Sequence, residues 1–182
     1  MWKVGSISFA LCMLLLLSFP LKADAAVLDS ELPATFLEFD LDESLCRLDG
    51  TLIQPDEMPL VENGVLLLPL RTIAESFGYT VTWDSTRGQA VVSSEMRTIS
   101  LAPGNESASI SEQDTSTVIS LAATPKSVGG RIMVPSDCIP VLLDCQVRWD
   151  QSSEKCLIST VGPGGQTIGA DKMISYLAES GK

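Results

Sequence analysis

Histidine is absent from the 182 residues, and this absence restricts the chemistry open to the chain. Without imidazole there is no Ser-His or Cys-His nucleophile pair, and the usual nitrogen ligand for zinc or copper is missing. No G-x-S-x-G motif is present either. Mechanisms that use carboxylates alone, or that a lysine assists, survive this restriction. A carboxylate enzyme needs two acidic residues converging in one cleft. The sequence therefore predicts a non-catalytic protein without a cofactor or a metal.

Basic residues are also scarce, with 12 Lys and Arg against 23 Asp and Glu and a net charge of −11. Binding to nucleic acid requires a basic footprint, and so does electrostatic attachment to anionic lipid. We therefore expect no nucleic-acid partner. The acidic balance is typical of a well-solvated surface.

Long hydrophobic runs are limited to one, Ile7–Phe19, which is 13 residues long and is followed by Ala23-Asp24-Ala25. A membrane-spanning helix needs about 20 residues, whereas this length with small residues after it is typical of a signal peptide. We expect residues 1–25 to be removed, which leaves a chain of net charge −12 without a membrane span. The predicted location is secreted or cell envelope. The alternative is a retained anchor.

Four cysteines follow the predicted signal peptide: Cys46, Cys138, Cys145 and Cys156. None forms a CxxC pair, which disfavours a zinc ribbon or a thioredoxin-like motif. An oxidising location would permit disulfides, and four cysteines allow three pairings. Buried free thiols are the alternative.

The sequence contains an internal repeat with an offset of 66 residues. Segment 59–93 aligns without a gap on 125–159, with eight of 35 positions identical. Both copies contain a glycine turn, a short apolar strand ending in proline, a helix, and a hairpin that begins V-x-W-D. In copy one, Leu70, Ile73, Ala74 and Phe77 predict an apolar helix face and Gly78 predicts its end. In copy two, Pro140 and Asp144 predict a short or distorted helix.

Further strands are expected around this pattern. Asp49-Gly50 predicts a hairpin between 45–48 and 51–54, and other strands are expected at 97–101, 107–110 and 117–121. The fold class is α+β, a mostly antiparallel sheet with short helices, in two tandem strand-helix-hairpin repeats (about 45–95 and 108–160) within a domain spanning 26–160. Residues 161–182 are expected to form a Gly/Pro linker and a terminal helix, 171–180.

The string from Val61-Glu62-Asn63-Gly64 through 68–78 (LPLRTIAESFG) to 81–84 (VTWD) resembles the copper amine oxidase N-terminal-like domain, or stalk domain, of bacterial exported proteins. Copy two keeps Val134-Pro135 and Trp149-Asp150 but replaces Leu-Arg by Ser136-Asp137. The resemblance implies a stalk-type fold outside the cytoplasm and an interaction role. It does not imply amine oxidation, because copper and quinone belong to a separate catalytic domain in the oxidase.

Five residues are weak binding candidates: Arg71, Trp83, Asp84, Trp149 and Asp150. The tryptophans could form a carbohydrate platform, although filling the core at a hairpin end is the favoured interpretation, with each aspartate starting the turn. Arg71 could bind a carboxylate or phosphate, but pairing with Glu75 is favoured.

Asp40, Asp42 and Glu43, with Asp49 nearby, could suggest calcium, but they lack the Gly and the final Glu of an EF-hand loop. We expect them on the exposed face of a strand.

Together these observations predict a non-catalytic exported or cell-envelope interaction module, whose partner is an envelope protein or a wall polymer. The alternative is a carbohydrate- or wall-polymer-binding protein that uses the paired tryptophans.

Overall fold

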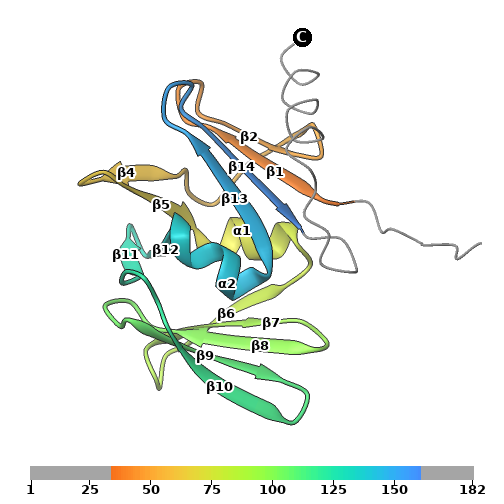
Figure 1. The fold of residues 1–182 in the computed structure, drawn as a ribbon, viewed down its shortest axis with the longest axis vertical. Coiled ribbons are helices and arrows are strands. Elements are labelled where there is room, and N and C mark those ends of the chain that lie inside the picture. Colours follow the sequence, from red (N-terminus) through yellow and green to blue (C-terminus); the bar gives the residue numbers. More distant parts are fainter. Residues whose placement is uncertain (1–33, 161–182) are drawn as a thin grey trace, which may run out of the picture. The chain divides into compact units, whose positions relative to one another are not determined.

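The computed structural model describes residues 34–160. The expected signal peptide, the Gly/Pro linker and the terminal helix lie outside the described residues. The described part contains three antiparallel sheets and two short α-helices (Figure 1). No helix within 34–160 is long and apolar enough to cross a membrane.

Sheet A has the strand order β13-β14-β1-β2-β3, sheet C the order β10-β9-β8-β7-β6, and sheet B the order β11-β12-β5-β4. The strands of sheet A are β1 (Phe36–Asp40), β2 (Leu45–Leu48), β3 (Thr51–Ile53), β13 (Cys145–Asp150) and β14 (Lys155–Thr160). Those of sheet B are β4 (Leu60–Glu62), β5 (Val65–Pro69), β11 (Lys126–Val128) and β12 (Arg131–Pro135). Those of sheet C are β6 (Thr80–Asp84), β7 (Gln89–Ser93), β8 (Arg97–Leu101), β9 (Ser107–Glu112) and β10 (Thr115–Ser120).

The helices lie with sheet B between sheets A and C (Figure 1). Helix α1 spans Leu70–Ser76 and begins directly after Pro69. Proline is tolerated at the start of a helix because a backbone N–H at that place would make no bond within the helix. Gly78 ends it with φ +83°, and its N–H bonds to the carbonyl of Glu75. The predicted helix and its glycine end are confirmed.

The second helical segment is short, as expected. A 3-10 turn, Ser136–Cys138, leads into α2, Ile139–Leu143, with Pro140 in its first turn. Asp144 ends α2 in the left-handed conformation, at φ 50°. The position that glycine occupies after α1 is thus occupied after α2 by an aspartate.

The glycine turns behave as the sequence predicts. Asp49 and Gly50 both have positive φ, 48° and 78°, between the paired strands β2 and β3. A two-residue turn of this type matches the right-handed twist of antiparallel strands. Asn63 and Gly64 make the same turn between β4 and β5.

A single apolar cluster connects the three sheets. Leu37 and Phe39 of β1, Leu68 of β5 and Ile99 of β8 are fully buried in it, together with Ile73 of α1. Burying a side chain of this size contributes about 1.5–3 kcal/mol relative to exposure. The short elements are therefore held by shared packing rather than by their own length.

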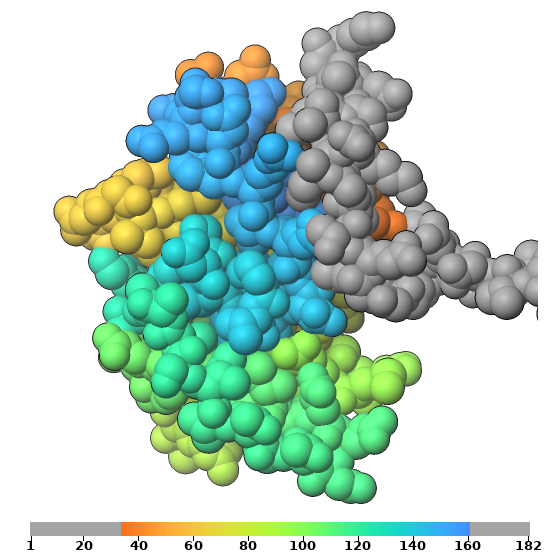
Figure 2. Space-filling model, in the orientation of Figure 1, coloured from red at the N-terminus to blue at the C-terminus, as the bar shows by residue number. Residues whose placement is uncertain are grey.

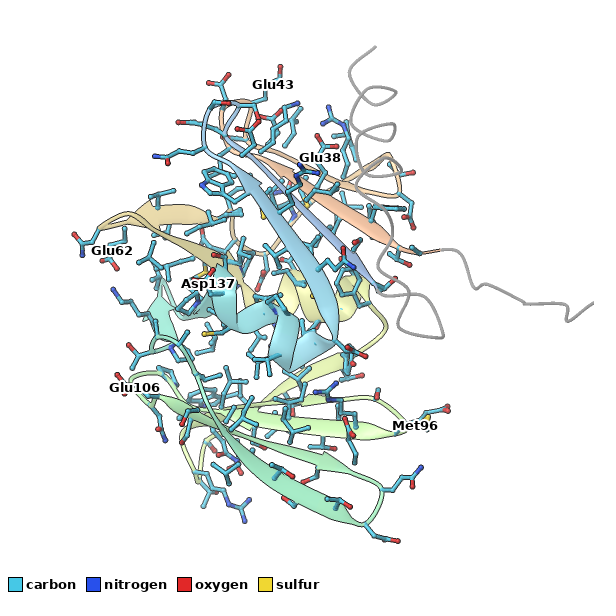
Figure 3. The ribbon with its side chains drawn as sticks, in the orientation of Figure 1. Glu38, Glu43, Glu62, Met96, Glu106 and Asp137 are labelled. Carbon is cyan, nitrogen blue, oxygen red and sulfur yellow. The ribbon has the colours of Figure 1, made fainter. Side chains whose placement is uncertain are left out.

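The sequence placed Asp40 on a strand with Asp42 and Glu43, but it did not predict the bounds or the pairing of strand β1. It pairs with β14, its partner more than a hundred residues away, in a register that sets Leu37 opposite Ile158. The prediction that Asp40 lies on an exposed strand face is wrong, because Asp40 is only 2% exposed. Asp42 and Glu43 lie in the turn after β1, and Figure 3 shows Glu43 at the tip of sheet A.

The pairing of β5 with β12 relates the two copies of the 66-residue pattern. Leu68 lies opposite Val134, and Leu67 opposite Pro135. Leu68 and Val134 are themselves 66 positions apart. Sheets A and C also share one arrangement, since β13-β14 is followed in sheet A by β1-β2-β3, just as β6-β7 is followed in sheet C by β8-β9-β10.

Candidate functional site

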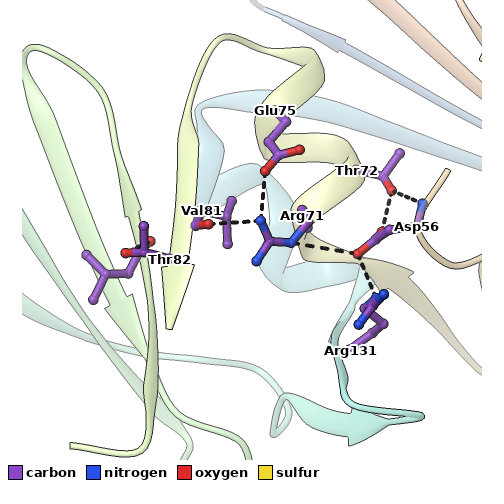
Figure 4. Close-up of polar contacts among 8 residues, drawn as sticks. Asp56, Arg71, Thr72, Glu75, Val81, Thr82 and Arg131 are labelled. Atoms are coloured by element: carbon purple, nitrogen blue, oxygen red, sulfur yellow. Dashed lines mark hydrogen bonds and ion pairs between the residues drawn. The ribbon is translucent and has the colours of Figure 1, made fainter. Parts of the chain in front are cut away.

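A polar network centred on Asp56 joins three parts of the fold (Figure 4). Asp56 lies in the loop after β3, and its N–H donates to Thr72 Oγ1 at 3.2 Å. The Thr72 hydroxyl donates in turn to Asp56 Oδ1 at 2.6 Å. Asp56 Oδ2 lies 3.2 Å from Arg131 Nε and 3.8 Å from Arg71 Nε. One carboxylate thus ties the first turn of α1 to the first residue of β12.

Arg71 already has protein partners for much of its guanidinium. Its Nη1 donates to Glu75 Oε1 at 2.9 Å, which confirms the expected pair one helical turn apart. The same nitrogen donates to the carbonyl of Val81 at 2.9 Å. A side chain of helix α1 therefore occupies one backbone carbonyl of β6, an edge strand of sheet C.

Beside this network is a cleft of about 100 Å³, lined among others by Arg71, Trp83 and Arg131. These three residues are about half exposed. The exposed fraction is 43% for the side chain of Arg71, 49% for the side chain of Arg131 and 50% for Trp83 as a whole. The two guanidinium charges face the carboxylates of Asp56 and Glu75, so the cleft carries no excess of positive charge. It offers an aromatic face with polar donors at its rim.

The two Trp-Asp pairs differ in burial. Trp149 packs against the core, as expected for a hairpin end, whereas half of Trp83 is exposed. The core-filling interpretation therefore fails for Trp83. The aspartates do start the turns: Asp84 Oδ1 accepts the N–H groups of Thr86 and Arg87.

Asp150 plays the same part in the second hairpin, where its Oδ1 accepts from the N–H and the hydroxyl of Ser152 at 2.9 and 2.6 Å. The hydroxyls of Ser152 and Ser153 lower the pKa of Asp150 to about 2. The backbone N–H and the side chain of Arg87 likewise lower the pKa of Asp84. Both carboxylates are turn-forming acceptors that stay ionised.

The acidic residues of β1 form buried ion pairs. Asp40 Oδ2 lies 3.0 Å from Lys155 Nζ, and Glu38 Oε1 lies 3.7 Å from the same nitrogen and 3.9 Å from Arg47 Nη1. Burial by itself raises the pKa of Asp40, but the Glu43 N–H and the Lys155 ammonium outweigh it and lower that pKa. Within 34–160 no group of three or more acidic or cysteine side chains could hold a metal ion.

Cys46, Cys138, Cys145 and Cys156 are all buried as free thiols. Burial raises the pKa of Cys46, Cys145 and Cys156 to about 12. A thiol with so high a pKa is a poor nucleophile, because the thiolate is the reactive form. These side chains act as small apolar groups of the core.

The shifted pKa values of the aspartates, the tyrosine and the thiols all lie farther from neutral pH than the ordinary values of these groups. Those of Asp40, Asp84 and Asp150 are lowered, and burial raises the pKa of Tyr79 and of the three thiols. A catalytic acid or base needs a pKa moved toward the working pH. These groups have moved away from it.

Sequence reasoning found Arg71 and Trp83 but missed the residues that complete the cleft. Asp56 and Arg131 come from a loop and a strand far apart in the chain, and no local spacing connects them. Asp84, Trp149 and Asp150 do not line this cleft.

Comparisons with known proteins give a match to one family model. The model of the copper amine oxidase N-terminal domain matches residues 47–158. Neither the curated proteins nor the solved structures contain a match to the chain. The family match covers more than half of the 182 residues, and the chain therefore belongs to the copper amine oxidase N-terminal domain family, whose domain is a non-catalytic, stalk-type module.

Proposed function

We propose that this chain is an exported, non-catalytic interaction module of the cell envelope, acting as a rigid scaffold for an envelope protein or a wall polymer. The family assignment over residues 47–158 carries the proposal. The direction of the pKa shifts supports it, since they keep aspartates ionised and thiols protonated. Export rests on the 13-residue apolar run and the small residues after it.

The proposal is tested by locating and capturing the protein in its own cell. Fractionation should recover it outside the cytoplasm, shortened by about 25 residues if the apolar run is a signal peptide. Crosslinking in intact envelopes, followed by mass spectrometry, should then recover one reproducible protein or glycan partner. A full-length chain confined to the cytoplasm would contradict the proposal, and so would an envelope sample without a reproducible partner.

A second candidate, binding of a carbohydrate or wall polymer, is favoured by Trp83. A half-exposed indole beside two arginines offers an aromatic face and hydrogen-bond donors to a sugar ring. Trp149 provides the matched control because it packs against the core. Soluble wall fragments should perturb the fluorescence of the wild type and of a Trp149→Phe variant, but not that of Trp83→Phe. The same response in all three proteins would remove this candidate.

The internal repeat is proposed to be a structural duplication within this module. The β5–β12 pairing centred on Leu68 and Val134 supports it, because each residue faces its own counterpart at the offset of 66. The shared arrangement of sheets A and C supports it as well. The two halves would then be β1 to β7 and β8 to β14, each supplying strands to both outer sheets.

A further inference from the structure

The three sheets of the described region have six edge strands, and five of them are protected against pairing with another chain. An unprotected edge presents free N–H and C=O groups to any extended segment, so proteins shorten, charge or cover their edges. Strands β3, β4 and β11 have three residues each. Lys126 of β11 and Glu62 of β4 carry charges and form an ion pair with each other, and Figure 3 shows Glu62 on the β4 hairpin.

The longer edges β6 and β13 are protected in other ways. Arg71 occupies the carbonyl of Val81 on β6. Strand β13 carries Arg148 and Asp150. A second chain approaching either strand would meet a charged side chain.

Strand β10 has none of these protections. It spans six residues, TSTVIS, without a charge or a proline, and every residue except Ile119 is exposed. Figure 1 shows β10 as the outermost strand of sheet C, and Figure 2 shows residues in its colour range at the lower border of the molecule. Val118 is 72% exposed, the highest value among the exposed large hydrophobic residues of the described region.

The backbone of β10 fixes which groups face outward. The N–H of Leu121 donates to the carbonyl of Glu106 at 2.8 Å, so these two residues occupy a bonded position of the β9–β10 ladder. Bonded and non-bonded positions alternate along an antiparallel pair. The backbone groups of Thr115, Thr117 and Ile119 therefore face β9, and those of Ser116, Val118 and Ser120 face away from sheet C.

We propose that β10 pairs antiparallel with β10 of a second copy of this chain, with Val118 opposite its own counterpart. In this register Ser116 lies opposite the partner's Ser120, and about six N–H···O bonds form from groups that the monomer leaves to water. The most exposed apolar side chain is buried against its counterpart at the centre, flanked by small hydroxyl residues. The strand is thus complementary to itself, as a two-fold interface requires.

Charge also favours this register. Two copies of a chain with net charge −11 repel each other, and β10 is a stretch where they can meet without opposing like charges. Asp114, which precedes β10, would lie opposite Ala122 of the second copy. Because the attraction comes from uncharged groups and the repulsion from distant carboxylates, added salt should strengthen the association.

The same arrangement limits growth to two copies. After β10 pairs with β10, the outer edge of sheet C on each copy is β6, whose Val81 carbonyl is occupied by Arg71. The result is a closed dimer with a ten-stranded sheet rather than a fibre. A contact of two strands buries less area than a standard interface, so the dimer should dissociate on dilution.

Sedimentation of the full chain over a range of concentrations tests the proposal. Val118→Pro should lower the association constant at least about tenfold, because it removes an outward N–H, while the monomer keeps its β9 bonds. Leu52→Pro is the matched control: Leu52 is the middle residue of edge strand β3, is 60% exposed, and should leave association unchanged. Circular dichroism and Tm establish that both variants are folded.

A crosslink tests the register. Cα atoms of directly opposed, bonded residues lie about 5.5 Å apart, which is within reach of a disulfide. Val118→Cys should therefore form a disulfide-linked dimer under mild oxidation, and Leu52→Cys should not. Three outcomes would overturn the proposal: a wild type that stays monomeric up to about 1 mM, equal association in both proline variants, or a crosslink through Leu52→Cys only.

Discussion

At the scale of single residues, the least expected feature is the pair of buried acids on β1. Glu38 and Asp40 are 1% and 2% exposed, and burying a carboxylate is costly unless a cation compensates it. Lys155 lies within reach of both. Because the ammonium donates to Asp40, the pKa of Lys155 is raised while that of Asp40 is lowered.

Asp40→Asn should destabilise the fold by about 1–3 kcal/mol at neutral pH, since a hydrogen bond between charged groups is lost and Lys155 loses its nearest partner. The folded-state pKa of Asp40 lies below the unfolded value. Its contribution is therefore complete above about pH 4 and is lost as the pH falls through the folded-state pKa. Urea unfolding at several pH values measures both effects.

Asp42→Asn is the control for this experiment, because Asp42 lies exposed in the adjacent turn and should change stability by less than about 0.5 kcal/mol. Equal losses for the two variants would show that Lys155 does not stabilise the ionised Asp40. A difference between wild type and Asp40→Asn that disappears already at pH 6 would contradict the direction of the pKa shift.

The four buried thiols give a second prediction at this scale. Their burial, and the pKa of about 12 for Cys46, Cys145 and Cys156, should keep them unmodified by a thiol reagent at pH 8 in the native protein. In denaturant all four should react within minutes, because an unperturbed thiol has a pKa near 8.5. Peptide mapping by mass spectrometry assigns each site. Rapid labelling of Cys156 in the folded chain would contradict its position in the core.

At the scale of elements, the two helices end differently at equivalent positions. Gly78 and Asp144 are 66 residues apart and both have left-handed backbone, at φ 83° and 50°. Glycine adopts this conformation without steric cost, whereas an L-residue is strained there.

Gly78→Ala should therefore lower the free energy of unfolding by about 1 kcal/mol, and Asp144→Gly should raise it by up to about 0.5 kcal/mol. The second gain is smaller because glycine also increases the entropy of the unfolded chain. Thermal and urea unfolding of the two single variants measure both signs. Destabilisation by Asp144→Gly would show that the aspartate side chain makes a stabilising contact that outweighs its backbone strain.

The sequence predicted those elements that depend on neighbouring residues and missed one that depends on distant residues. The β2–β3 turn, the bounds of α1 and the shortness of α2 follow from residues within a few positions of one another, and each was found. The bounds and the pairing of strand β1 were missed although Leu37 and Phe39 alternate with Glu38 and Asp40, because acidic residues on the second face resemble a solvated segment until Lys155 is brought beside them.

In the candidate site, too, only the contact between residues close in the sequence was predicted. The pair of Arg71 with Glu75 lies one turn apart on a helix and was predicted, whereas Asp56 and Arg131 join it only through the fold. The exposure of Trp83 against the partial burial of Trp149 could not be predicted either. The same dipeptide occupies the same place in both copies, and the difference comes from the surrounding strands.

At the scale of the whole described region, the ends of the two outer sheets are closed by the same hydrogen bonds. Between β14 and β1, the N–H of Thr160 donates to the carbonyl of Thr35, and the N–H of Thr35 donates to Thr160 Oγ1. Between β7 and β8, Ser94 and Arg97 make the same two bonds. In the second case a two-residue loop, Glu95-Met96, connects the strands, with Met96 at its tip in Figure 3. In the first case the chain is not continuous between them.

This equivalence predicts that the β7–β8 loop and the β14–β1 gap can be exchanged. A circular permutant would start at residue 97, run to 160, continue through a two-residue linker to 35 and end at 94. It should fold with a stability within about 1 kcal/mol of the linear segment 35–160, because both halves keep every strand partner and the closed loop has the same length. Each outer sheet takes two strands from one half and three from the other. The pairing of the strands is therefore the same whether the covalent connection is at the β7–β8 junction or at the β14–β1 junction. The measurement is urea unfolding of the permutant and the linear segment side by side, and a permutant that is unfolded while the linear segment folds would show that the two junctions are not equivalent.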